Sequence, residues 1–167
     1  METMVRSKPQ ARHTKTWREK LRPEMKPKLV TPSLKWQQKF GHGKMLIATP
    51  LLVDRLIREI PKGNVTTINA IRKKLADDFG ADYTCPITTG IFTWIVAHAA
   101  EEDKINYASR SPYWRVVKEN GGLNPRYPGG EKHHAQLLKA EGHTIAKTKN
   151  GRHHYLADLN DSMILFD

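Results

Sequence analysis

The side chain best suited to nucleophilic chemistry in this sequence is its single cysteine, Cys85. It stands directly before Pro86, at the expected start of a helix, where the helix dipole favours a thiolate. Such a thiol is a candidate acceptor in group transfer, although an inert buried or capping cysteine is the commoner case and is favoured here. A single cysteine excludes an intramolecular disulfide and favours a reducing, intracellular setting.

Two adjacent histidine pairs, His133-His134 and His153-His154, are the candidates for metal binding. Neighbouring side chains on a helix or strand diverge, so such a pair does not converge on one ion. No Cys/His spacing in the chain matches a structural zinc site. We expect no metal and no cofactor, and histidines that are solvated on a surface facing nucleic acid.

The charge balance indicates an anionic partner. Lys and Arg number 28 against 17 Asp and Glu, for a formal net charge of +11 and a pI near 9.8. Nucleic acid, an anionic membrane and an acidic protein all fit this balance. The longest apolar segment, residues 91–100, is broken by Thr93 and His98 and is too short to span a bilayer. Because no signal sequence is evident either, we expect a soluble, monomeric, cytoplasmic protein with no membrane partner.

Residues 1–45 differ from the rest, with twelve Lys or Arg against three acidic residues and four prolines. We predict a basic, partly extended N-terminal arm, which is either a solvated, partly disordered segment or an arm that grips phosphates. The two interpretations are compatible because such arms often order on binding. Trp17 and Trp36 indicate that parts of it pack on the following domain.

Three helices are predicted next. Thr49-Pro50 is a helix-start signal, and Pro61 ends that helix. The second helix runs from Thr67 to about Phe79, where Gly80 stops it. The third runs from about residue 85 to 102, with apolar residues at spacing four (Ile87, Ile91, Ile95 and Ala99) and an exposed side that carries Thr88, Thr89 and Gly90. Two such helices joined by a short link with glycine form a helix-turn-helix pattern.

The C-terminal part has a strand-like texture. We predict a strand over 113–117, a turn over 119–122, a loop over 127–130, and a short helix over 131–141. Asn150-Gly151 predicts a hairpin with strands at 143–148 and 152–157, followed by a loose tail. The predicted fold class is α+β: a winged-helix-like helix-turn-helix domain over 46–145, after the arm and before a hairpin and tail over 146–167.

Three segments in order resemble the 6-O-alkylguanine-DNA alkyltransferase family. They are IPKGNVTT at 60–67, PYWRVV at 112–117, and YPGG at 127–130 followed by LL at 137–138 and EGH at 141–143. They resemble the family's opening of the helix-turn-helix, its PCHRVV strand, and its YSGG loop with the helix that follows. The resemblance covers about residues 48–145.

The main departure lies in the second segment. The family's PCHRV motif places a cysteine thiolate in a pocket, with a histidine that relays its proton to a glutamate. Here Tyr113 and Trp114 stand at the cysteine and histidine positions, and Glu141 matches the glutamate. A phenol with a pKa of about 10 is a poor acceptor at neutral pH. The chain is therefore most similar to the non-catalytic alkyltransferase-like relatives, which bind alkylated guanine in DNA, flip it out and hand the lesion to nucleotide excision repair.

The resemblance also implies site residues. The family tyrosine that crowds the target's phosphate is replaced by Ile68, and no arginine lies near Ile87 to fill the vacated base stack. Ile87 itself is a candidate apolar wedge, and Arg72, Arg110 or Arg115 are candidates to reach in from elsewhere. The expected DNA contacts, with the helix at 84–95 in the minor groove, are Lys62, Asn64, Thr66, Thr67, Arg72, Thr88 and Thr89. The expected base-pocket residues are Tyr113, Trp114, Arg115, Tyr127, Pro128, Gly129 and Glu141, with Arg115 mainly an internal hydrogen-bonding residue.

The sequence thus predicts a DNA-binding protein of the alkyltransferase-like type, nucleoid-associated and without catalytic residues. Its partners would be double-stranded DNA containing 6-O-alkylguanine and nucleotide excision repair proteins. One alternative is an active alkyltransferase that uses Cys85. The other is a general nucleic-acid-binding protein without the lesion pocket, whose binding depends strongly on salt.

Overall fold

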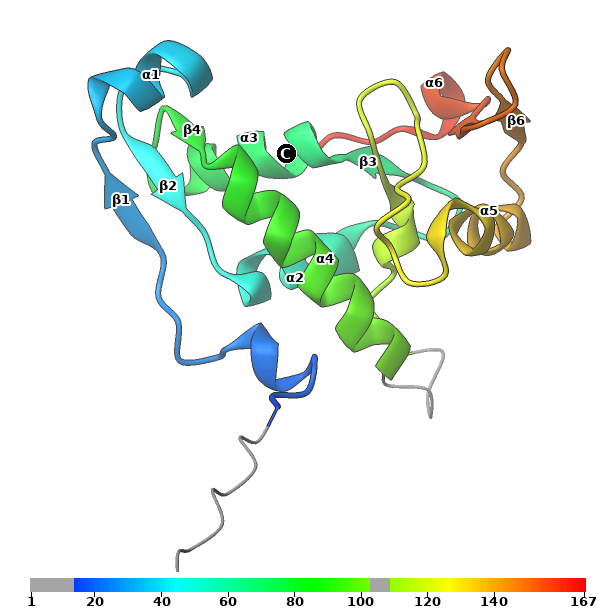
Figure 1. Cartoon of the computed structure of the whole chain (residues 1–167), viewed down its shortest axis with the longest axis horizontal. Coiled ribbons are helices and arrows are strands. Elements are labelled where there is room, and N and C mark those ends of the chain that lie inside the picture. Colours follow the sequence, from blue (N-terminus) through cyan, green and yellow to red (C-terminus); the bar gives the residue numbers. More distant parts are fainter. Residues whose placement is uncertain (1–13, 103–108) are drawn as a thin grey trace, which may run out of the picture.

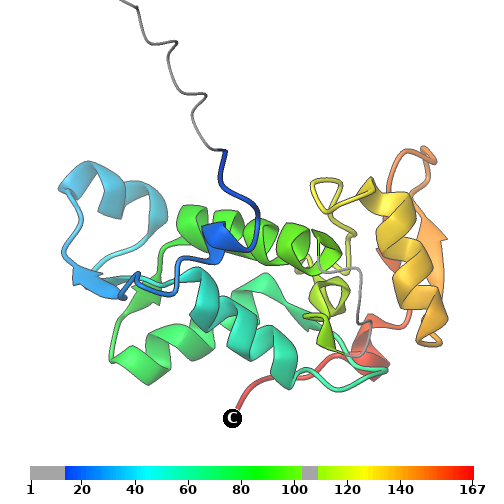
Figure 2. The same ribbon diagram turned by 90° about the horizontal axis from the view of Figure 1, so that it is seen from below.

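Helix α4 (Pro86–Glu102) crosses α2 (Pro50–Glu59) and also contacts α3 (Ile68–Phe79) in the computed structural model (Figure 1), which describes residues 14–102 and 109–167. Figure 2 shows α4 as one layer over a second layer made by α2 and α3. The chain is of the α+β class, as predicted, because short strands join and flank these helices. None of the helices in the described ranges is long and apolar enough to cross a membrane.

The starts of α2 and α3 follow from local hydrogen bonds. The Thr49 hydroxyl accepts from the Leu52 N–H, and the Thr67 hydroxyl accepts from the Ala70 N–H. Each satisfies an N–H group that has no partner within the helix. Gly80 ends α3 with a φ of +65°, a left-handed conformation that favours glycine. The predicted boundaries of both helices are confirmed.

Short strands connect the helices in three small sheets. Strand β2 (Met45–Ile47) lies between β1 (Lys28–Val30), antiparallel, and β4 (Tyr83–Thr84), parallel. Strand β3 (Thr66–Thr67) pairs in parallel with β5 (Val116–Val117), which brings the second and first motif segments together. The predicted hairpin is confirmed as β6 (Ile145–Lys147) and β7 (His154–Leu156). The remaining elements are η1 (Glu19–Leu21), α1 (Leu34–Phe40), η3 (Tyr113–Arg115), α5 (Gly130–Ala140) and α6 (Leu159–Ser162).

The basic N-terminal segment is partly folded, and residues 1–13 lie outside the described residues. Trp17 stacks on His98 of α4 with ring centroids 4.3 Å apart, and its backbone N–H donates to Glu102. The Trp36 indole N–H donates to the Tyr83 hydroxyl at 3.1 Å. Both tryptophans therefore pack on the domain, as predicted.

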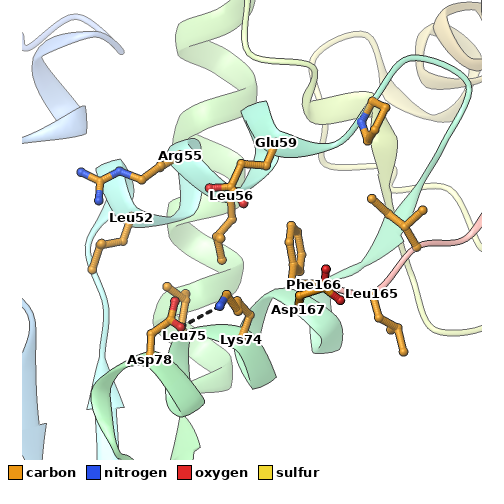
Figure 3. A pocket seen from close by; sticks show the side chains of 12 residues that line it. Leu52, Arg55, Leu56, Glu59, Lys74, Leu75, Asp78, Leu165, Phe166 and Asp167 are labelled. Carbon is orange, nitrogen blue, oxygen red and sulfur yellow. Dashed lines mark ion pairs between the residues drawn. The ribbon is translucent and has the colours of Figure 1, made fainter.

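The C-terminal tail is not loose, contrary to the prediction. The Ile164 N–H donates to the Val65 carbonyl at 2.8 Å, and the Thr66 hydroxyl donates to the Ile164 carbonyl at 2.8 Å. Figure 3 shows Phe166 directed between α2 and α3, beside a cavity of about 500 Å³. The tail extends the β3 edge and covers apolar side chains of both helices, a pairing that spans about a hundred residues of sequence.

The buried side chains form two clusters. One lies beneath α2, α3 and α4, and includes Leu46, Ile57 and Ile71. The other lies between the C-terminal end of α4, η3 and α5, and includes Tyr113, Trp114, Tyr127 and Leu138. The second cluster contains Tyr113, Trp114 and Tyr127, three of the residues expected to line a base pocket. The packing of these side chains determines whether a pocket is open between them.

Candidate nucleic-acid interface

Helix α4 presents an apolar ridge to solvent. Ile87 is 49% exposed, Ile91 is 47% exposed and Trp94 is 36% exposed. They follow one another at spacings of four and three, so they share a helix face. This ridge forms one wall of a groove of about 760 Å³ between α4 and the loop after β5. The groove is lined by Ile68, Pro86, Ile87, Gly90, Ile91, Thr93, Trp94, Asn124 and Arg126.

The exposed face near the start of α4 differs from the predicted one, because Ile87 and Ile91 are exposed, whereas Ile95 and Ala99 pack inward as predicted. Thr89 is fully buried, and its hydroxyl donates to the Cys85 carbonyl at 2.7 Å. The hydroxyl oxygen of Thr88 is buried too. Neither side chain is available to a phosphate, so both predicted DNA contacts are wrong. The buried face instead contains Phe92, Val96 and other residues. Because α4 is apolar on nearly all sides, the spacing of its apolar residues did not identify the face that packs.

The opposite wall of the groove is a loop held in place by α5. The Asn124 side-chain oxygen accepts from the Arg126 N–H, and the Asn124 N–H donates to Nδ1 of His134. Nε2 of His134 donates to the Trp114 carbonyl at 2.8 Å. Burial lowers the pKa of His134 to about 4, so the imidazole is neutral. These bonds leave the exposed Arg126 at the edge of the groove, the one arginine among its described lining residues.

The two tyrosines expected to line a base pocket instead pack against each other. Their ring centroids are 5.1 Å apart at an interplanar angle of 87°, an edge-to-face contact. Tyr113 is fully buried, and Tyr127 is 3% exposed and donates to the Val116 carbonyl at 3.3 Å. The rings fill the space between them, so the structure has no open base pocket between these two side chains.

Glu141 organises the rest of the expected pocket. Both of its oxygens accept from Nε of Arg115, one also accepts from Nη2 at 2.7 Å, and the Trp114 indole N–H donates at 3.0 Å. Nη1 of Arg115 donates to the Ile60 carbonyl at 2.6 Å. The internal role expected for Arg115 is confirmed. Burial raises the pKa of Glu141, but the bonds and charge of Arg115 and the Trp114 bond outweigh it and lower the pKa. The carboxylate is thus engaged structurally.

Pro128 and Gly129 shape the turn into α5. Gly129 has a φ of +77°, and a Cβ at this position would lie 2.6 Å from Cβ of His133. Both facts require glycine here. The predicted loop is confirmed, and its two residues set the entry angle of the helix.

The DNA contacts predicted around β3 are dispersed. Thr66 and Thr67 are buried, with one hydroxyl bonded to Ile164 and the other capping α3, so neither is available to a phosphate and both predictions are wrong. The Asn64 amide donates to the Ser162 carbonyl. Lys62 is exposed but lines a different cavity from the α4 groove. The structure therefore separates the residues that the motif placed on one surface.

The arginines considered as substitutes for the missing finger are all held elsewhere. Nε of Arg72 donates to the Thr84 carbonyl, Arg110 pairs with Glu101, and Arg115 pairs with Glu141. Arg72 remains near the start of α4 and stays a predicted DNA contact. Arg126, which lines the α4 groove, was not among the predicted site residues, although its place in the loop before Tyr127 was a usable signal.

Cys85 is 3% exposed and lies at the junction of β4 and α4. Its backbone N–H donates to the Leu46 carbonyl at 2.8 Å. The thiol is thus packed in the core, in agreement with the inert interpretation. Among the described residues, no group of three or more His, Cys, Asp or Glu is arranged to hold a metal ion.

Two solved structures are among those similar to this chain. No family model matches the chain, and no curated protein matches it. The structure of S. pombe Atl1 in complex with damaged DNA containing O6-carboxymethylguanine is similar with a TM-score of 0.49 and 24% identity. The match covers 69% of this chain and 93% of that chain. The structure of S. pombe ATL in complex with DNA is similar to the same extent.

Proposed function

We propose that this chain binds duplex DNA along the α4 groove, in the manner of an alkyltransferase-like protein, and transfers no alkyl group. The observation that carries the proposal is the exposed ridge of Ile87, Ile91 and Trp94 beside Arg126, on a chain with a net charge of +11. An apolar ridge beside a groove marks an interaction surface. The net positive charge favours a polyanion as the partner.

The minor groove of DNA suits such a ridge. Apolar side chains of minor-groove binders wedge between base steps and kink the duplex, and cations beside them hold the phosphates. Ile87 and Ile91 would supply the wedge, and Arg126 would supply a phosphate contact. Trp17, which packs edge-to-face on Trp94 at 4.6 Å, would bring basic N-terminal residues to the same side.

The proposed absence of alkyl transfer rests on the properties of the two candidate acceptors, Tyr113 and Cys85. Burial raises the pKa of Tyr113 well above its ordinary value, and the hydrogen bond to Glu101 raises it further. Its hydroxyl is therefore a neutral donor, which is a poor nucleophile. Cys85 is buried, so its thiol does not face the groove.

A damaged base would be recognised at a different place from the predicted pocket. An extruded base would enter the α4 groove, whose volume of about 760 Å³ lies within the usual range for ligand pockets. Ile68, at the family's tyrosine position, lines this groove together with Trp94. The apolar lining would accept an alkylated guanine more readily than a polar base.

Fluorescence anisotropy with matched labelled duplexes tests this function. We expect binding that weakens steeply with salt, and tighter binding to a duplex with one O6-methylguanine than to its unmodified copy. Mass spectrometry after incubation should show an unchanged protein mass. A methyl adduct on any residue would refute the absence of transfer, and no duplex binding at low salt would refute the whole proposal.

A general nucleic-acid-binding protein is the second candidate. The Tyr113–Tyr127 contact favours it, because the rings occupy the space that a flipped base would need between them. It predicts equal affinity for damaged and undamaged duplexes. Delivery of lesions to excision repair proteins and a nucleoid location belong to the first candidate only.

A further inference from the structure

A second cavity of about 570 Å³ lies where the C-terminal end of α2 meets η3 and α5. It shares no lining residue with the α4 groove. Six of its lining residues lie in the motif segments, but none of them lines the proposed DNA surface along α4. Its lining consists of Arg58, Lys62, Arg110, Pro112, Trp114, Arg115, Leu137, Ala140 and Glu141.

The lining is cationic. Among the lining residues that the structure describes, four are Lys or Arg, and Glu141 is the one acidic side chain. That carboxylate is already occupied by Arg115. Asp54 pairs with Arg58 at 2.9 Å and Glu101 pairs with Arg110 at 3.1 Å. Four cations against these three carboxylates still leave one net positive charge.

Hydrogen-bond donors remain among the cationic lining residues. Lys62 is exposed, and within residues 14–102 and 109–167 no hydrogen bond or ion pair engages its ammonium, which carries three donors. Arg58 uses Nε on Asp54 and Nη1 on the Ser109 carbonyl. Its Nη2 has no bond to any residue in the described ranges. An ammonium and a guanidinium nitrogen that line one cavity are donors suited to an oxyanion.

The remainder of the wall is apolar. Pro112, Leu137 and Ala140 line the cavity, together with the edge of the buried Trp114 ring. An inorganic ion would fill only a small part of about 570 Å³. A ligand that places a phosphate beside Lys62 and Arg58 and a flat, less polar group against the apolar wall fits both parts of the lining.

We propose that this cavity binds a phosphate monoester carried on a nucleoside, with Lys62 and Arg58 contacting the phosphate. The same chemistry is found in a free mononucleotide and in the 5′-phosphorylated end of a strand. The site is independent of the α4 groove and does not rest on the proposed DNA binding.

Isothermal titration calorimetry on the full chain tests the proposal, with deoxyguanosine 5′-monophosphate, deoxyguanosine and inorganic phosphate as probes. We expect the nucleotide to bind at least about tenfold more tightly than either of its parts. Lys62→Gln and Arg58→Gln should each weaken nucleotide binding about tenfold, while Lys149→Gln, at an exposed position in the hairpin turn, should not. Equal binding of nucleoside and nucleotide, or no effect of Lys62→Gln, would overturn the proposal.

Two further arms separate the sources and the sites. Competition by a 5′-phosphorylated oligonucleotide, but not by its unphosphorylated copy, would identify a strand end as the source. Competition by neither would identify the free nucleotide. Ile91→Asp, on the α4 ridge, should leave nucleotide binding unchanged. If it abolishes nucleotide binding, the nucleotide binds in the α4 groove and this proposal is wrong, whatever the outcome for duplex DNA.

Discussion

The Tyr113 hydroxyl donates a 2.6 Å hydrogen bond to the carboxylate of Glu101. Glu101 lies on α4 and also contacts His133 and Arg110, so it joins α4, η3 and α5. Burial raises the pKa of Glu101, but the bonds from Tyr113 and His133 and the charge of Arg110 outweigh burial and lower it. The residue at the family's acceptor position thus serves as a donor to a structural carboxylate.

Replacing Tyr113 by Phe should destabilise the fold by about 2 kcal/mol, because a charged acceptor loses its shortest hydrogen bond. The ring contact with Tyr127 would remain. Chemical denaturation measures the loss, and Tyr155→Phe, at a more exposed ring, is the control. Equal stability of the two variants would show that the bond contributes little.

Replacing Glu141 by Gln should destabilise the fold by about 3 kcal/mol, because it leaves the charge of Arg115 unpaired in a largely buried site. Glu119→Gln, at an exposed turn position, serves as the control. Thermal denaturation of both variants checks the difference. A loss below 1 kcal/mol (the range of exposed pairs) would contradict the structural role assigned to this carboxylate.

Because of His134, the free energy of unfolding should decrease as the pH falls. Its pKa is about 4 in the fold, against an ordinary value of 6.5, so the unfolded chain binds the proton first as the pH drops. This contribution is present above pH 6.5 and is lost as the pH falls to about 4, a change on the order of 3 kcal/mol. Urea denaturation from pH 7 to pH 4 should show it in the native chain. His134→Gln should have a shallower pH dependence, and identical curves would exclude this origin.

Replacing Ile91 by Asp should weaken duplex binding at least about tenfold, because a carboxylate would replace an apolar wedge next to the phosphates. The side chain is 47% exposed, so the fold should persist. Leu34→Asp, at a 78% exposed position on α1, is the matched control. Anisotropy titrations of both variants with duplex DNA measure the two affinities. Equal affinities would remove the ridge from the interface.

Replacing Arg126 by Gln should weaken duplex binding in a salt-dependent manner. Loss of one phosphate contact makes the negative slope of log K against log salt concentration shallower by about one. Titrations at several salt concentrations measure that slope. A uniform loss of affinity at every concentration would mean that Arg126 acts through the loop rather than through a phosphate.

Local signals predicted much of the secondary structure. Thr49, Pro50, Thr67 and Gly80 each act through hydrogen bonds or dihedral angles within a few residues, so the limits of α2 and α3 were readable. The Asn150-Gly151 turn predicted its hairpin for the same reason. The expected strand over 113–117 was wrong in its first three residues, which form η3, because Tyr113 and Trp114 are held by partners on α4 and α5.

By itself, the sequence determined the strong positive charge, the three motif segments, and the replacement of the Cys-His pair by Tyr113 and Trp114. Only the tertiary structure decided that the rings of Tyr113 and Tyr127 meet, that Thr89 is buried while Ile91 is exposed, and that Lys62 lies apart from the α4 groove. The reason is physical. Composition and motif identity are properties of the chain alone. Contacts between residues far apart in sequence decide which face of a largely apolar helix packs and how much space is left between two rings.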